Sequence, residues 1–149
     1  FGVLVFIEDF NELLTQNAES YGLAARFAGA APVGFTFNDV LQGFSDPTEL
    51  IEKFKTAARK LIARGADVII PGEAPLNVLL ARNGVTEVDG VTIMDSLGTW
   101  VKHAEMMVDL RRLCGTKPSR TGYYHRLPEI ERVKEVFAFY GLDKRLPGV

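Results

Sequence analysis

Short, mostly apolar runs alternate along the chain with longer segments whose apolar residues recur every three or four positions. The runs at residues 2–7 and 68–70 are continuous, whereas those at 32–37 and 91–94 contain threonine, and Gly34 weakens the former. Runs of this length predict short strands, and continuous rather than alternating hydrophobicity is typical of strands buried on both faces. The intervening segments have helical spacing, and they cover residues 10–21, 47–62, 76–83 and 97–114.

A strand followed by a helix thus occurs four times. Short helical crossovers require parallel pairing with right-handed connections. We therefore expect an α/β fold over residues 1–115, a three-layer unit with a four-stranded parallel sheet of doubly wound, flavodoxin-like type. Residues 116–149 are expected to form a C-terminal arm and docking helix, in which the stretch 116–126 is basic, rich in turns and carries Tyr123 and Tyr124. Pro128 opens a final helix, which we expect to dock on another domain or subunit.

Capping residues set the expected helix starts. Asp9 has capping-box spacing for the first helix. The second helix is predicted by three residues at its start: Asp46 at the N-cap, Pro47 in the first turn and Glu49 three residues after the cap. Residues 38–45 are expected to be a polar loop at the carboxyl end of the second strand.

Composition narrows the class of protein. The 149 residues are 47% hydrophobic, enough for one substantial core. The net charge of −2 gives no excess of positive charge with which to bind nucleic acid or an anionic membrane. No apolar run approaches the roughly 20 residues of a membrane helix. The lone Cys114 fits a reducing compartment, so we expect a cytoplasmic protein. The chain starts at Phe1 on a strand without a signal peptide, from which we expect a missing N-terminal portion.

Glu73 is the best functional candidate, because it follows the buried strand 68–70 directly. Ligands of open α/β sheets bind outside the carboxyl ends of the strands. The same edge should gather the other polar residues that follow strands, including Asp9, Asn38, Asp95 and Ser96. Three uses of such a cluster stay open: a general base with a raised pKa, a Mg²⁺ site, or simple helix capping by the aspartates.

The remaining reactive side chains carry weaker signals. His103 and His125 lack a metal-type partner nearby in sequence, and His103 is expected to be a structural or surface residue. Cys114 falls at the negative end of a helix, where a thiolate is disfavoured. Neither GxxxxGK[ST] nor GxGxxG follows a strand, so the phosphate-binding fingerprints are absent.

Four segments of the sequence form a recognisable set: DPTELIEKFKTAARKLIARGADVIIPGEAPLN, VTIMDSLGTWVKHAEMM, SYGLAARFAG and the SRTGYY of the tail. In these segments the chain resembles the C-terminal half of the Asp/Glu/hydantoin racemase superfamily. Members typically show a DP-opened helix, a GADVI strand, a G-C-x-G turn, an I-D strand end and a long helix. The likeness covers roughly residues 1–125.

The resemblance implies a site in which two α/β halves each supply a cysteine, working as acid and base on opposite faces of a carbon. Here Glu73 stands at the cysteine position, and Pro75, which lacks an N–H, stands at the following glycine position. Backbone groups after position 73 would hold the substrate. The substrate-binding residues implied in this way are Ala74, Pro75, Leu76 and Asn77.

These departures make a two-cysteine amino-acid racemase improbable. The expected activity is that of a related isomerase or lyase, working without a cofactor at a carbon next to a carbonyl or carboxylate. Its substrate would be a small organic acid, amino acid or hydantoin-type compound, with Glu73 as the base. The missing half or a second copy would complete the site. The alternative is a non-catalytic domain of the same fold that binds a small ligand, or none.

Overall fold

The computed structural model describes residues 1–122 and 125–142, so Tyr123 and Tyr124 of the expected arm lie outside the described residues. The chain divides into two compact units, Phe1–Glu105 and Met106–Val149. The first unit holds every strand of the sheet together with helices α1 to α4, and α5 (Ser96–Cys114) begins in it. The second unit holds the end of α5 and helix α6 (Ile130–Phe139). None of the described helices is long and apolar enough to cross a membrane.

The first unit is an α/β fold around a mixed sheet of five strands in the order β2-β1-β3-β5-β4. The strands are β1 (Gly2–Val5), β2 (Gly29–Pro32), β3 (Val68–Pro71), β4 (Glu87–Val88) and β5 (Val91–Ile93). Neighbours β2, β1, β3 and β5 pair in parallel, as the alternation of strands and helices predicted.

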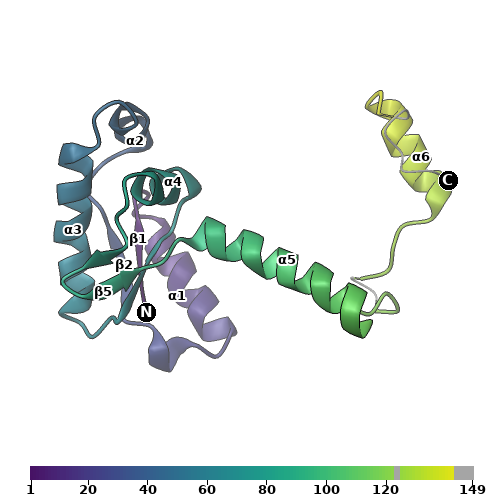
Figure 1. Ribbon diagram of the computed structural model, residues 1–149, viewed down its shortest axis with the longest axis horizontal. Helices are drawn as coiled ribbons and strands as arrows, with labels where there is room; N and C mark the ends of the chain where they lie inside the picture. Colours follow the sequence, from purple (N-terminus) through teal and green to yellow (C-terminus); the bar gives the residue numbers. More distant parts are fainter. Residues whose placement is uncertain (123–124, 143–149) are drawn as a thin grey trace. The chain divides into compact units, whose positions relative to one another are not determined.

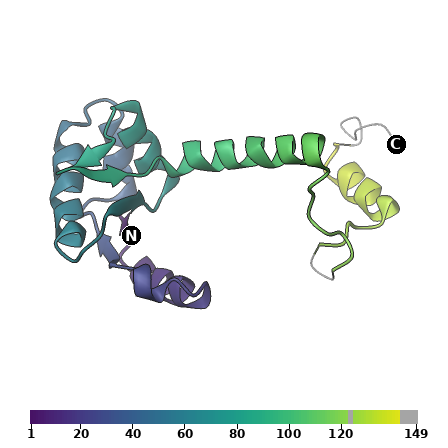
Figure 2. The ribbon, with the colours of Figure 1, turned by 60° about the horizontal axis from the view of Figure 1, so that its bottom comes forward.

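Helices cover both faces of this sheet. They are α1 (Phe10–Ser20), α2 (Phe37–Gly43), α3 (Thr48–Ile62) and α4 (Ala74–Arg82), with a 3₁₀ turn at Ala24–Arg26. Figures 1 and 2 show α3 and α1 on opposite sides of the strands. This follows from right-handed crossovers, because the chain moves in one direction from β1 to β2 and in the other from β2 to β3.

The core lies between the sheet and helices α3 and α4. Leu4 and Ile69 of the central strands meet Phe54 and Leu61 of α3 there, all four without solvent exposure. The α1 face of the sheet is covered less completely, and Ala18 is the buried residue of α1. One face of the sheet therefore carries most of the stabilising apolar burial.

The expectation of four parallel strands was wrong, because β4 adds an antiparallel fifth strand at the edge. Its two residues pair with β5 across a hairpin turn at Asp89 and Gly90. Both turn residues have positive φ, 51° and 79°, as the tight turn that matches strand twist requires. Asp-Gly is a common sequence for such a turn, but a two-residue strand is too short to leave a hydrophobic pattern.

The second strand and the loop after it also differ from expectation. The strand covers Gly29–Pro32 rather than residues 32–37, since its register with β1 ends where Val5 meets Pro32. Residues 38–45 begin in helix α2 instead of a loop. Thr36 and Asp39 start that helix with a capping box, in which the Asp39 carboxylate accepts the Thr36 N–H at 2.7 Å.

Three smaller expectations were wrong as well. Asp9 precedes α1 but makes no side-chain cap. Asp46 does accept the Thr48 N–H at 3.1 Å, yet Glu49 pairs with Lys53 instead of closing a box. Strand β3 is not buried on both faces, because buried and half-buried positions alternate along it. Its half-buried side faces the site described next.

Candidate functional site

Glu73 sits at the topological switch point of the sheet. Strand β1 lies between β2 and β3, so the connections that leave the carboxyl ends of β1 and β3 diverge at this place. Ligands of open α/β sheets bind in the crevice at such a point. Glu73 is the extended N-cap residue of α4, directly after β3. Its Oε1 accepts the Phe6 N–H at 3.0 Å, which ties the end of β3 to the end of β1.

The second carboxylate oxygen of Glu73 is enclosed by protein. Oε2 is buried and has no hydrogen-bond partner among the described residues. Burial raises the pKa of Glu73 above its ordinary value, and the backbone N–H groups of Phe6 and Ile7 oppose that rise. The environment therefore favours the protonated acid more than water would. A carboxyl group poised in this way can exchange a proton closer to neutral pH than an exposed glutamate.

A cleft of about 540 Å³ opens beside Glu73. It lies on the half-buried side of β3, since Ile69 faces the core and Ile70, the next residue, faces the cleft. Most of its lining surface is apolar. The residues that line it are Ile70, Pro71, Gly72, Glu73, Ala74, Met94, Ser96, Leu97, Thr99, Trp100 and His103.

The first turns of α5 form one wall of the cleft. Ser96, Trp100 and His103 recur at helical spacing and share a face of this helix. Trp100 is 75% exposed, so a ligand in the cleft could cover its indole ring. The other wall is the carboxyl end of β3 and the start of α4.

Asn77 holds the two walls together from inside the protein. It is 2% exposed, the one polar side chain buried in the described chain. Its Oδ1 accepts the Leu97 N–H at 3.1 Å, and its Nδ2 donates to the Met94 carbonyl at 3.4 Å. Met94 and Leu97 both line the cleft. Asn77 thus fixes α4 to the start of α5, and its polar atoms are already occupied.

The structure brings together some of the expected site residues and separates others. Ala74 and Ser96 line the cleft with Glu73. Asp95 lies between two lining residues and caps α5, with its Oδ1 accepting the Gly98 N–H at 2.9 Å. Leu76 is buried in the core.

The remaining expected residues lie outside the lining of the cleft. Pro75 is half-buried in the first turn of α4, and Asn38 is exposed in the first turn of α2. Asp9 is exposed at the start of α1. Within residues 1–122 and 125–142, no group of three or more His, Cys, Asp or Glu side chains is placed to hold a metal ion.

Sequence reasoning missed Trp100 and His103 as lining residues. His103 was expected to be structural or on the surface, and it is exposed on α5 at the cleft. Their signal was present in the spacing, because Trp100 follows Ser96 by four residues and His103 follows Trp100 by three, which places all three on one helix face. Ser96 itself was placed at the carboxyl edge by the strand before it.

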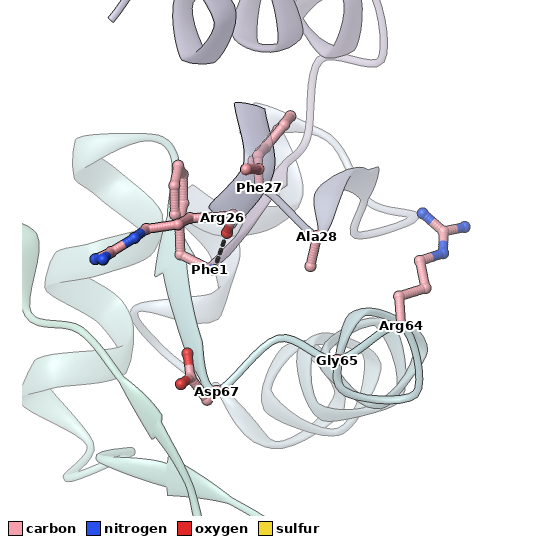
Figure 3. Close-up of a pocket in the computed structure, with 8 residues that line it drawn as sticks. Phe1, Arg26, Phe27, Ala28, Arg64, Gly65 and Asp67 are labelled. Atoms are coloured by element: carbon pink, nitrogen blue, oxygen red, sulfur yellow. Dashed lines mark hydrogen bonds between the residues drawn. The ribbon is translucent and has the colours of Figure 1, made fainter. Parts of the chain in front are cut away.

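A second cavity, of about 580 Å³, lies at the opposite edge of the sheet (Figure 3). Phe1, Phe27 and Asp67 line it near the amino ends of the strands. The guanidinium groups of Arg26 and Arg64 extend to different sides in Figure 3 and do not converge on one point. Because ligands of such sheets bind at the carboxyl ends of the strands, the cleft beside Glu73 is the better candidate.

Comparison of the chain with protein-family models, curated proteins and solved structures gave no match in any of the three. The resemblance to the racemase superfamily therefore stays a prediction from the sequence segments quoted above.

Proposed function

We propose that this protein is an isomerase or lyase that works without a cofactor at a carbon next to a carbonyl or carboxylate, with Glu73 as its base. The observation that carries the proposal is the position of Glu73 at the switch point, in the wall of a cleft sized for a small molecule. Its raised pKa matches the task of taking a proton from carbon near neutrality.

Further support comes from the resemblance to the racemase superfamily, in which the position of Glu73 carries an acid–base cysteine. The proposed reaction begins when Glu73 takes the hydrogen from the substrate carbon. The electron pair moves onto the neighbouring carbonyl oxygen and forms an enolate. Return of a proton to the carbon completes an isomerisation, whereas loss of a leaving group completes an elimination. A second half or a second copy of the chain would supply the acid on the opposite side.

The test of this proposal is solvent exchange at the reacting carbon. The protein is incubated in D₂O with cyclohexyl methyl ketone and with 2-phenylpropanoate, and loss of the α-hydrogen signal is followed by proton NMR. We expect Glu73→Gln to lower the exchange rate by at least about 100-fold, the usual scale of general-base catalysis. The amide oxygen of glutamine can still accept the Phe6 N–H, so the fold is preserved.

Glu8→Gln is the matched control, because Glu8 is an exposed acid that follows β1 at the same edge. It should exchange at the wild-type rate. Exchange by the wild-type protein that survives in Glu73→Gln would remove Glu73 from the mechanism.

A second candidate function is the binding of a small ligand without turnover. The specific observation in its favour is that Oε1 is engaged by Phe6 and Oε2 is shielded, which suits a structural clamp between two strands. In that case both probes would saturate the cleft and neither would exchange.

A further inference from the structure

Most of the lining surface of the cleft is apolar, and no lysine or arginine stands among the lining residues. We propose that its ligand is an uncharged carbonyl compound, a ketone or ester with an apolar body, and not a carboxylate anion. This inference rests on the proposed function and narrows its substrate class.

The first argument concerns backbone donors. A carboxylate at this edge would be bound by N–H groups at the starts of α4 and α5. At the start of α5, the Leu97 N–H is taken by Asn77 and the Gly98 N–H by Asp95. At the start of α4, Pro75 has no N–H.

Two more backbone N–H groups in the first turns of these helices are occupied. The Asn77 N–H is taken by the Glu73 carbonyl at 3.0 Å. The Thr99 N–H is taken by the Asp95 carbonyl at 2.9 Å. Four backbone N–H groups at the two helix starts are therefore bound within the protein and do not compensate an anion.

The second argument concerns charge. All the lining residues are described, and Glu73 and His103 are the titratable side chains among them. Asp95 adds a second carboxylate at the rim, between the lining residues Met94 and Ser96. Moving an anion from water into an apolar cleft without a fixed cation is costly. A neutral carbonyl loses much less hydration, and its apolar body can cover Ile70, Leu97 and the face of Trp100.

The experiment compares three probes of nearly equal shape: cyclohexyl methyl ketone, cyclohexanecarboxylate and cyclohexylmethylammonium. Trp100 is the single tryptophan of the chain and lines the cleft, so its emission reports binding directly. At pH 7 we expect the ketone to bind at least about tenfold more tightly than the carboxylate. Equal or tighter binding of the carboxylate overturns the proposal, and so does tighter binding of the ammonium ion.

Three variants locate and explain the preference for the ketone. Ala74→Phe should fill the cleft and abolish ketone binding, whereas Val78→Phe, an exposed position of α4 outside the lining, should bind normally. Asp95→Asn keeps an oxygen for the Gly98 N–H and removes a charge, so the carboxylate should bind about threefold more tightly and the ketone unchanged. Ketone binding that survives Ala74→Phe would place the ligand elsewhere and refute the assignment.

This inference and the proposed function fail separately. If the ketone is preferred but no α-hydrogen exchanges, the ligand class stands and catalysis by Glu73 does not. If exchange occurs and the carboxylate is the tighter ligand, catalysis stands and the ligand class does not.

Discussion

Replacing Asn77 by alanine should cost far more stability than its size suggests. The side chain is 2% exposed and makes hydrogen bonds to the Leu97 N–H and the Met94 carbonyl. Alanine leaves both groups without a partner in a partly buried place. An unsatisfied buried group costs about 1–3 kcal/mol, so we expect the free energy of unfolding to fall by about 2–3 kcal/mol. For a unit of this size, that loss corresponds to a melting temperature about 8–20 °C lower.

The same helix supplies a matched control. Asn83 also donates from its side chain to a carbonyl, that of Leu79 at 2.7 Å, but it is exposed at the end of α4. Water can replace that bond, so Asn83→Ala should lose only about 0.5–1 kcal/mol. Urea unfolding measures both variants, and amide exchange should show the Leu97 N–H losing protection in Asn77→Ala alone. Equal unfolding midpoints for the two variants, with Leu97 still protected, would refute the reasoning.

Three further changes test other parts of the fold. Because burial raises the pKa of Glu73, the stability that its protonated form contributes should be lost as pH rises from about 4.3 through the raised value. Urea titrations at several pH values should therefore show that the free energy of unfolding falls less steeply with rising pH in Glu73→Gln than in the wild type. An identical fall in both would contradict the pKa shift. Gly43→Ala would place a Cβ against Leu50 in the core, so calorimetry should show a loss of about 1–3 kcal/mol, and no loss would mean that the core is loosely packed there. Asp89→Asn breaks an exposed 2.9 Å ion pair with Arg59 and should cost less than about 1 kcal/mol, a loss that disappears in 1 M salt. A larger, salt-independent loss would show that the hairpin turn itself needs the aspartate.

The parallel part of the sheet could be predicted from the sequence because its signals are local and strong. Val68, Ile69 and Ile70 form an apolar run between helical segments, and parallel pairing follows from the crossovers. The position of Glu73 at the carboxyl edge followed from the same topology. Asp46 was expected to be the N-cap of α3, but Pro47 is the N-cap residue, and Asp46 accepts the Thr48 N–H from one position earlier.

The differences arose where a tertiary contact decided between local options. Residues 32–37 contain enough apolar side chains for a strand. In the structure, however, the pairing of β2 with β1 ends at Pro32, and the capping box of Thr36 and Asp39 starts helix α2. Strand β4 exists only because its two residues pair with β5. Asn77 was expected to bind substrate, and nothing in the sequence shows that its amide would instead join two helices.

The lining of the cleft could be predicted only in part. Glu73 and Ser96 were predicted at this edge because they follow strands, whereas Ala74 was implied by the family resemblance, and all three line the cleft. Trp100 and His103 lie further along α5, and their contribution depends on how Asn77 fixes the start of that helix. The direction of a helix as it leaves a sheet is set by such contacts, which a periodic pattern does not encode.

The two outermost strands make this sheet a poor template for self-association into fibres. At one border, β2 consists of four residues and ends on Pro32, whose nitrogen carries no hydrogen to donate. At the other border, β4 has two residues and turns back at once through Asp89 and Gly90. An extended segment from another molecule would find almost no continuous backbone to join at either side. Lengthening β4 by removing its turn should create the aggregation-prone margin that the natural sequence avoids.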